Sequence, residues 1–157
     1  MTRHRTLSIA ATMLLAGALA APAHAVDAMT TRDAPDLTAV RAKIKAREWK
    51  AAITDLNAMI DKGVQHADVY NLLGFSLRSD GDNQTAQTFY RKALEFDPDH
   101  KSALEYQGEL FIKIGDMTKA RENAARLARL CPQGCEERED LDKAIAQASA
   151  AASGGAR

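Results

Sequence analysis

Two consecutive 34-residue segments decide the fold of this chain: residues 67–100, ADVYNLLGFSLRSDGDNQTAQTFYRKALEFDPDH, and residues 101–134, KSALEYQGELFIKIGDMTKARENAARLARLCPQG. Residues that shape turns and close contacts recur one period apart: Gly74, Gly81, Asp82, Ala86 and Pro98 return as Gly108, Gly115, Asp116, Ala120 and Pro132. A fixed period of this length is the signature of stacked supersecondary units. The chain is therefore predicted to be built from repeated units.

Each segment carries the pattern of two helices joined by a short turn. In the first segment, Tyr70, Leu73 and Leu77 lie three and four residues apart, which predicts an apolar stripe on a helix over residues 68–79. The Gly-Asp pair that follows predicts a turn, because glycine ends a helix in the left-handed region and aspartate caps the next one. A proline then stops the second helix. We expect these second helices over residues 83–96 and 117–130.

These spacings resemble the tetratricopeptide repeat, a helix–turn–helix unit of 34 residues. The resemblance implies an all-α, right-handed superhelix of about three units followed by a C-terminal capping helix. It also implies a non-catalytic adaptor or scaffold that binds other proteins. The units are expected at residues 33–66, 67–100 and 101–134, and the capping helix at residues 137–148.

The first unit departs from the pattern. Trp49, Ala52 and Leu56 occupy second-helix positions, but Arg47-Glu48 stands where the other units have Gly-Asp. A terminal unit is expected to deviate, because its outer face meets water instead of a neighbouring unit.

Gly74 and Gly108 fall in the middle of predicted helices, where glycine costs about 1 kcal/mol relative to alanine. Close helix contact is the usual compensation. We therefore expect these glycines to let the two helices of a unit approach, with Ala86 and Ala120 as the small residues that face them.

The N-terminus is typical of an export signal. Arg3 and Arg5 precede an apolar stretch, and Ala23-His24-Ala25 is a small-x-small cleavage site. An uncleaved membrane anchor is the alternative, but the stretch is shorter than the roughly 20 residues that span a bilayer. The sequence predicts a signal peptide over residues 1–25 and a periplasmic protein without a stable membrane insertion. Residues 26–32 and 149–157 are expected to be disordered.

Charge argues against two classes of partner. The chain has 21 basic and 21 acidic residues; without residues 1–25, which contain Arg3 and Arg5 and no acidic residue, the counts become 19 and 21. A nucleic-acid-binding domain would show a strongly basic surface. No Lys/Arg-rich amphipathic segment is present to hold a membrane surface. We expect a protein or peptide partner, and no nucleic acid.

The two cysteines lie in Cys131-Pro132-Gln133-Gly134-Cys135, between the last repeat and the capping helix. Export favours a disulfide between Cys131 and Cys135, since oxidising compartments keep paired thiols oxidised. Two alternatives remain open. A redox centre would prefer the spacing Cys-x-x-Cys, and a zinc site would need two further ligands nearby.

The resemblance also places a candidate binding surface. In this family, defined positions of each first helix line a concave groove. When these positions are carried over to this chain one by one, they hold a mixture of charged, polar and apolar side chains. Phe75 and Ile112 offer apolar contact, and an exposed aromatic residue is a plausible anchor. The expected partner-binding residues are Arg41, Lys45, Asn71, Phe75, Arg78, Glu105, Glu109, Ile112 and Lys113. The alternative is that these are ordinary solvated helix positions.

No enzymatic motif is found in the sequence: it lacks a metalloprotease helix motif, a phosphate-binding loop and a nucleophile elbow. His66 and His100 lie one period apart, but polar residues commonly begin helices and we expect no metal site or cofactor. The leading hypothesis is an exported scaffold in the cell envelope. The rivals are an assembly factor or chaperone-like subunit that uses its convex face or cap, and a redox protein built on Cys131 and Cys135.

Overall fold

The computed structural model describes residues 34–154, and this range contains seven α-helices and no strand. The first helix is the shortest and the last is the longest. They are α1 (Thr38–Lys45), α2 (Trp49–Asp61), α3 (Ala67–Asp80), α4 (Asn83–Phe96), α5 (Lys101–Lys113), α6 (Met117–Leu130) and α7 (Glu136–Gly154).

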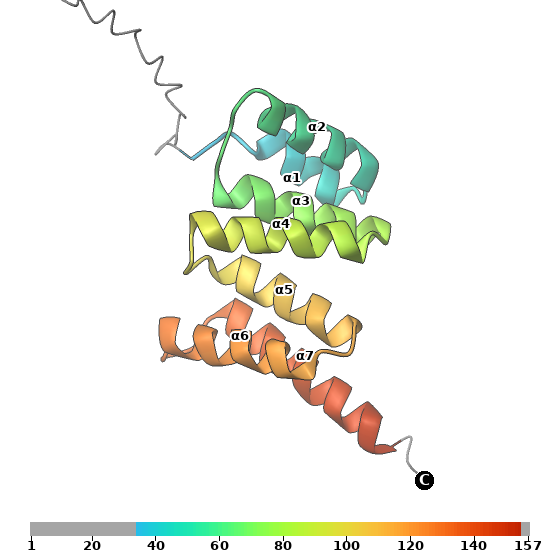
Figure 1. Cartoon of the computed structure of the whole chain (residues 1–157), viewed down its shortest axis with the longest axis vertical. Coiled ribbons are helices and arrows are strands. Elements are labelled where there is room, and N and C mark those ends of the chain that lie inside the picture. The colour runs from blue at the N-terminus through green and yellow to red at the C-terminus, as the bar shows by residue number, and fades with distance from the viewer. Residues whose placement is uncertain (1–33, 155–157) are drawn as a thin grey trace, which may run out of the picture.

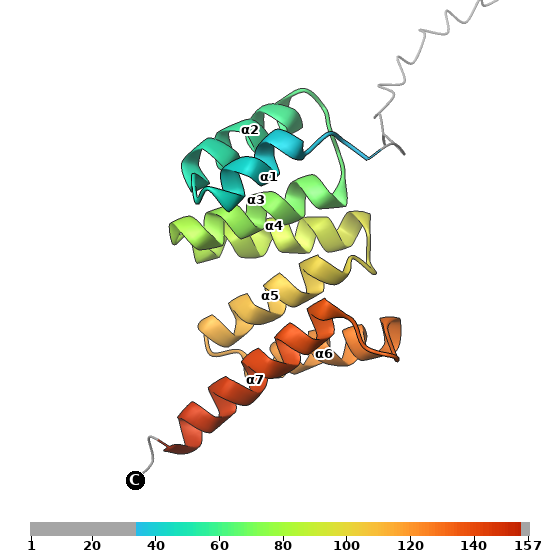
Figure 2. The same ribbon diagram turned by 180° about the vertical axis from the view of Figure 1, so that it is seen from behind.

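The helices form antiparallel pairs that stack along one axis. The pairs are α1 with α2, α3 with α4, and α5 with α6, and α7 packs against both α5 and α6. Figure 1 shows the stack running from α1 and α2 at one end to α6 and α7 at the other, and Figure 2 shows it from behind. The predicted fold class, an all-α stack of helix pairs with a final helix, is confirmed.

The inner turns follow the predicted chemistry. Gly81 and Gly115 adopt left-handed φ angles of 103° and 84°. Asp82 and Asp116 each accept a hydrogen bond from a backbone N–H in the first turn of the next helix, at 3.0 and 3.2 Å. In the first unit Arg47 takes the left-handed conformation in place of glycine, with φ 60°. The turn is therefore kept where its usual residue is missing, at the cost of backbone strain.

His66 and His100 begin helices. The ring nitrogen Nδ1 of His66 accepts a hydrogen bond from the Asp68 N–H, and that of His100 accepts one from the Ala103 N–H. The Nε2 atom of His100 also lies 2.9 Å from Asp68 Oδ1, which links the starts of α5 and α3. Both periodic histidines thus cap helices, and His100 also joins two neighbouring units.

The two mid-helix glycines meet different neighbours. A methyl group on Gly74 would lie 2.8 Å from ring atoms of Tyr90 and 3.2 Å from the carbonyl oxygen of Ala86. A methyl group on Gly108 would lie 2.6 Å from Leu141. The atoms nearest to this methyl group thus belong to a residue of α7, a neighbour that the repeat pattern does not predict.

The sequence explains this difference. Tyr90 covers Gly74, but one period later the equivalent position holds Ala124, whose methyl group is far smaller. The space left above Gly108 is filled by Leu141, which is completely buried. The final helix is therefore a specific part of the last unit's core.

The final helix is also longer than predicted. It begins at Glu136 and continues to Gly154, whereas the sequence predicts a capping helix over 137–148 and a disordered tail over 149–157. The reason is the run Ala150-Ala151-Ala152, because alanine has the highest helix propensity. In Figure 2 this second half of α7 projects beyond the stack.

Within residues 34–154, no helix combines the length and apolar character needed to cross a membrane. The predicted signal peptide over residues 1–25 and the linker over residues 26–32 lie outside the described part of the chain.

Candidate functional site

An aromatic cluster joins the three helix pairs on the side where the predicted groove residues lie. It consists of Trp49, Phe75, Tyr90 and Tyr106, which come from α2, α3, α4 and α5. The Phe75 ring lies 6.0 Å from the Trp49 ring and 4.9 Å from the Tyr106 ring, centroid to centroid. Tyr106 also lies 6.4 Å from Tyr90. Phe75, predicted to be a groove anchor, is therefore the centre of this cluster and is half-buried.

Arg78 is held firmly at this cluster. Its guanidinium carbon lies 5.7 Å from the Phe75 ring centroid and 5.8 Å from that of Tyr106, within the range of cation–π attraction. The Nη2 atom donates to Glu109 Oε2 at 2.7 Å. Two of the predicted groove residues, Arg78 and Glu109, thus form an ion pair between α3 and α5.

Four buried polar atoms on α3 and α4 have no hydrogen-bond partner among the described residues: Asn71 Oδ1, Arg78 Nε, Asn83 Oδ1 and the Tyr90 hydroxyl. Two of them belong to residues already discussed, Asn71 as a predicted groove residue and Tyr90 as a member of the aromatic cluster. Burial raises the pKa of Tyr90, which the positive charge of Arg78 opposes. Buried polar groups without partners are uncommon in proteins, so these two atoms are candidates for a role in binding.

Glu105 lies on α5 and is only 8% exposed. Burial raises the pKa of its carboxyl group to about 8, and the negative charges of Glu109, Asp140 and Glu137 add to this, while Arg78 opposes it. The group is therefore mostly protonated at neutral pH. The residues predicted to contact a partner from an open surface thus include one whose side chain is buried.

The remaining predicted residues are spread over the surface. Arg41 and Lys45 are exposed on α1, and the charge of Arg41 reaches Tyr106 on α5. Lys113 is exposed at the end of α5. Ile112 packs against the apolar cluster that contains Leu104 and Leu141, so it supports the core more than it offers a contact.

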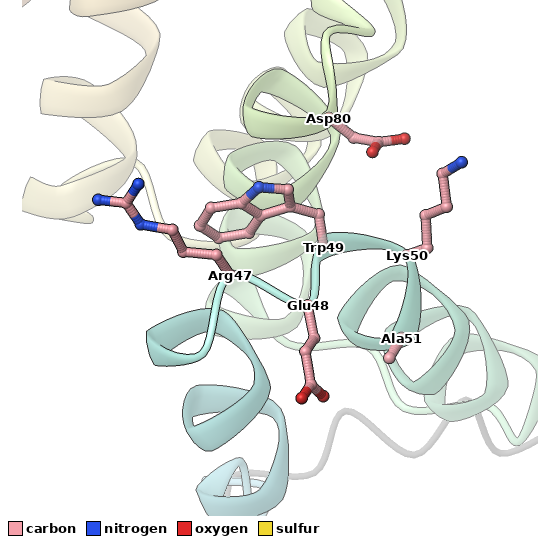
Figure 3. A pocket seen from close by; sticks show the side chains of 6 residues that line it. All are labelled: Arg47, Glu48, Trp49, Lys50, Ala51 and Asp80. Carbon is pink, nitrogen blue, oxygen red and sulfur yellow. The ribbon is translucent and has the colours of Figure 1, made fainter.

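A shallow pocket lies beside the cluster, at the turn between α1 and α2. Figure 3 shows Arg47 on one side of the Trp49 indole, and Asp80 and Lys50 on the other. The pocket is lined by Arg47, Glu48, Trp49, Lys50, Ala51 and Asp80. It is continuous with the aromatic cluster through Trp49, which contacts Phe75.

The repeat pattern does not assign Trp49 or Tyr106 to the binding surface. It gives Trp49 a second-helix position, and in the structure this is the first residue of α2, where the ring turns toward Phe75. Both are large aromatic residues in a chain with only 5% aromatic content, and that scarcity is the signal in the sequence that could have found them.

Comparison with known proteins identifies the repeat. The family model for the tetratricopeptide repeat matches residues 67–100, the same range as the predicted middle unit. Residues 67–100 therefore form a tetratricopeptide repeat. The family's helix–turn–helix unit therefore accounts for the pairing of α3 with α4.

Curated proteins are similar in sequence to part of this chain. Over 66 residues it is 33% identical to uncharacterized protein ycf37 of Pyropia yezoensis, a match that covers 42% of this chain and 36% of that protein. Over 63 residues it is 41% identical to the probable biofilm formation methyltransferase WspC of Pseudomonas putida, covering 40% of this chain and 15% of that protein. The chain thus spans well under two thirds of either relative.

A solved structure shares the fold of the repeat protein over most of its length. It is the crystal structure of PcrH in complex with the chaperone binding region of PopD, with a TM-score of 0.61. The likeness covers 73% of this chain and 86% of PcrH at 17% sequence identity. At this identity the comparison concerns the fold.

The cysteines of the repeat protein are joined. Cys131 and Cys135 form a disulfide with their Cα atoms 5.9 Å apart, directly between α6 and α7. The carbonyl oxygen of Cys131 also accepts a hydrogen bond from Arg138 on α7 at 3.3 Å. Both contacts tie the start of α7 to the end of α6. Across residues 34–154 no group of three or more histidine, cysteine or acidic side chains is arranged to hold a metal ion.

Proposed function

We propose that this protein is a non-catalytic adaptor that binds a segment of another protein on the face formed by α1, α3 and α5. The observation that carries the proposal is the aromatic cluster around Phe75, with the Arg78 guanidinium held beside the Phe75 and Tyr106 rings. Aromatic residues and arginine are the side chains that contribute most binding energy at protein interfaces. Here they are brought together from separate helices.

An unpaired polar atom lies close to the same face. The Asn71 carboxamide oxygen is on α3, one turn before Phe75, and because it is buried, a peptide N–H would reach it only after the side chain moves. PcrH, which shares the fold, has been solved with the chaperone binding region of PopD. A protein of this architecture therefore binds a segment of a protein, and we propose the same mode here.

We place the protein in the cell envelope. The basis is the predicted signal peptide over residues 1–25 together with the disulfide between Cys131 and Cys135. Disulfides persist in oxidising compartments such as the bacterial periplasm. Cleavage near Ala25 would leave the repeat domain free of the apolar N-terminal stretch.

A second candidate function is an assembly factor or chaperone-like subunit of an envelope complex, which would bind through its convex face or through α7. The observation in its favour is the second half of α7, which projects beyond the stack in Figures 1 and 2. A projecting helix offers a contact that does not involve the aromatic cluster.

Recovery of partners from the cells that make the protein distinguishes the two candidates. Phe75→Ala removes the central ring, and Lys45→Glu reverses a charge that is exposed on α1. Arg91→Ala on the exposed side of α4 is the matched control, with 66% of its side chain accessible. We expect both groove-side variants to lose the partner that crosslinking and mass spectrometry identify, and the control to keep it.

The control for folding is the melting temperature of each variant, which the Lys45→Glu change should leave unaltered. A partner that is retained by Phe75→Ala and Lys45→Glu but lost when residues 146–157 are removed would favour the assembly-factor role instead.

A further inference from the structure

The side chains that the predicted binding face exposes all carry positive charge. The repeat pattern assigns nine residues to this face, and those that are exposed in the structure are Arg41 and Lys45 on α1 and Lys113 on α5. The remaining members of the set are buried or half-buried. The exposed part of the predicted set is therefore entirely basic.

The acidic residues of the same set do not offset this charge. Glu109 pairs with Arg78, whose Nη2 atom lies 2.7 Å from Glu109 Oε2. Glu105 is only 8% exposed, and burial raises its pKa to about 8, so its carboxyl group is mostly protonated at neutral pH. One acidic residue is thus paired and the other is mostly neutral, so the charge of the exposed cations remains.

These cations lie on the same side of the stack as the aromatic cluster. Arg41, Phe75 and Glu109 are 34 residues apart and occupy the same position in three successive units. Phe75 and Glu109 contact the same arginine of α3, which places this position on the binding face. Lys45 and Lys113 follow Arg41 and Glu109 by four residues, one turn further along the same side of each helix. The exposed cations therefore share a face with the aromatic cluster.

The ordinary structural explanations cover only part of this charge. Lys43, on the same helix as Arg41, is half-buried and forms an ion pair with Asp55 of α2. Lys45 and Lys113 are the last residues of their helices, where a cation interacts favourably with the helix dipole. Arg41 lies in the middle of α1 and forms no ion pair with any residue that the structure describes. Neither pairing nor a helix end accounts for this arginine.

We propose that the face binds an acidic segment of the partner protein. Carboxylate side chains of that segment pair with Arg41, Lys45 and Lys113, and an apolar side chain packs on the aromatic cluster beside them. This inference rests on the proposed function, because it names the chemistry of the segment that the same face accepts. Complementary charge of this kind favours the correct partner over others and speeds association.

A polynucleotide is also acidic, but the charges beside the face fit it less well. Glu48 and Asp80 line the pocket at Trp49 together with Arg47 and Lys50, so acidic and basic side chains are equal in number there. The whole chain also has 21 basic and 21 acidic residues. A nucleic acid carries a phosphate at every nucleotide and would meet these carboxylates, whereas a protein segment can place its acidic residues only where the cations lie.

Synthetic peptides test this directly. The probes are dodecapeptides with one central phenylalanine flanked by glutamates, and matched peptides in which glutamine or lysine replaces each glutamate. Both ends are blocked, so that the charge comes from side chains alone. Trp49 is the only tryptophan of the chain and its ring lies 6.0 Å from that of Phe75, so its fluorescence reports binding at this face. The protein is the chain as purified from the cells that make it, with its disulfide intact.

We expect the glutamate peptide to bind roughly tenfold more tightly than the glutamine peptide, because each exposed ion pair contributes a factor of up to about five. The preference should fall as sodium chloride is raised from about 50 mM to about 500 mM, since salt screens exposed charges. The triple change Arg41→Gln, Lys45→Gln and Lys113→Gln should abolish it.

The matched control is the triple change Lys62→Gln, Arg121→Gln and Arg129→Gln. It removes the same charge from exposed positions on α6 and at the end of α2, outside the face, and should keep the preference. All the substituted side chains are exposed, so both triple variants should melt at the temperature of the original protein.

Equal affinity for the glutamate and glutamine peptides would overturn the inference, and if Phe75→Ala still weakened both, the proposed function would stand. Tighter binding of the lysine peptide would also overturn it, as would no binding of the glutamate peptide up to about 1 mM. A single-stranded DNA oligonucleotide that binds more tightly than the glutamate peptide, and is lost in the first triple variant, would assign the face to a nucleic acid. Peptide binding that Phe75→Ala leaves intact would instead count against the proposed function.

Discussion

Glu105 makes the stability of the fold depend on pH. In the folded protein its pKa is raised from 4.5 to about 8, chiefly by burial. Between these values the folded protein holds a proton that the unfolded chain releases, so the free energy of unfolding falls as the pH rises. We expect Glu105→Gln to gain stability relative to the original protein as the pH is raised through this window.

The measurement is thermal melting at several pH values between about 5 and about 9. Glu95→Gln is the matched control, since Glu95 is also a helical glutamate but 64% of its side chain is exposed. If the difference in melting temperature between Glu105→Gln and the original protein were constant across this pH range, Glu105 would titrate normally.

Gly74 has a different, steric role. Any side chain at this position would collide with α4, because even a methyl group would lie 2.8 Å from the Tyr90 ring and 3.2 Å from the Ala86 carbonyl oxygen. We expect Gly74→Leu to lower the free energy of unfolding by about 1–3 kcal/mol through overpacking. Denaturant titration measures this loss of stability. The control is Ser79→Leu, because Ser79 is on the exposed side of the same helix. Equal stability of the two variants would contradict the observed pairing of α3 with α4.

At the level of elements, the last unit depends on α7. Leu141 is completely buried and fills the space above Gly108 that Ala124 leaves open. Leu141→Ala should therefore lower the free energy of unfolding by about 2–5 kcal/mol, as expected for a large core side chain. Ile145→Ala, one turn further along and only half-buried, should cost less. Similar losses for both would mean that Leu141 has no special place in the core.

The disulfide fixes the same helix by a covalent bond. Closing the short loop between Cys131 and Cys135 stabilises the folded state by about 2 kcal/mol in the chain-entropy model. We expect the double change Cys131→Ser and Cys135→Ser to lower stability by up to that amount, and reduction of the original protein to have the same effect. Thiol labelling of the native protein tests whether the disulfide is present. Cysteines that react before reductant is added would exclude the bond.

The elements show why the sequence predicted some features and not others. Turns and caps at Gly81, Asp82, Gly115 and Asp116 depend on local chemistry, so the repeat predicted them correctly. The partner of Gly108 is Leu141, which lies far along the chain on another element, and a local pattern does not contain that information. Arg47 is an intermediate case, because the repeat fixed the place of the turn but not the residue's left-handed conformation.

The proposed binding face shows the same mixture. Family positions named Phe75, Arg78 and Glu109, and the structure brings these three side chains into contact. They did not indicate that Glu105 would be buried, or that two of the charges acting on it, Glu137 and Asp140, would come from α7, outside the repeat to which Glu105 belongs. Partner residues chosen from a repeat pattern alone are therefore least dependable next to the terminal helix.

On the scale of the whole molecule, each unit packs mainly against its neighbours, so stability should vary along the stack. The middle pair has the most extensive contact, and α3 has eight buried residues while α1 has one. We expect hydrogen exchange to be slowest in α3 and α4, and fastest in α1 and in the projecting half of α7. Mass spectrometry of exchanged peptides measures this profile.

The same experiment shows how far a local defect spreads. Leu141→Ala removes a contact between α7 and α5, so exchange should become faster in α5, α6 and α7. Protection in α1 and α2 should be unchanged, because neither helix packs extensively against α7 and the intervening pair of α3 and α4 stays packed. A uniform loss of protection over residues 34–154 would instead mean that the stack unfolds as one cooperative unit, and that a partner bound at the α7 end would stabilise the α1 end equally.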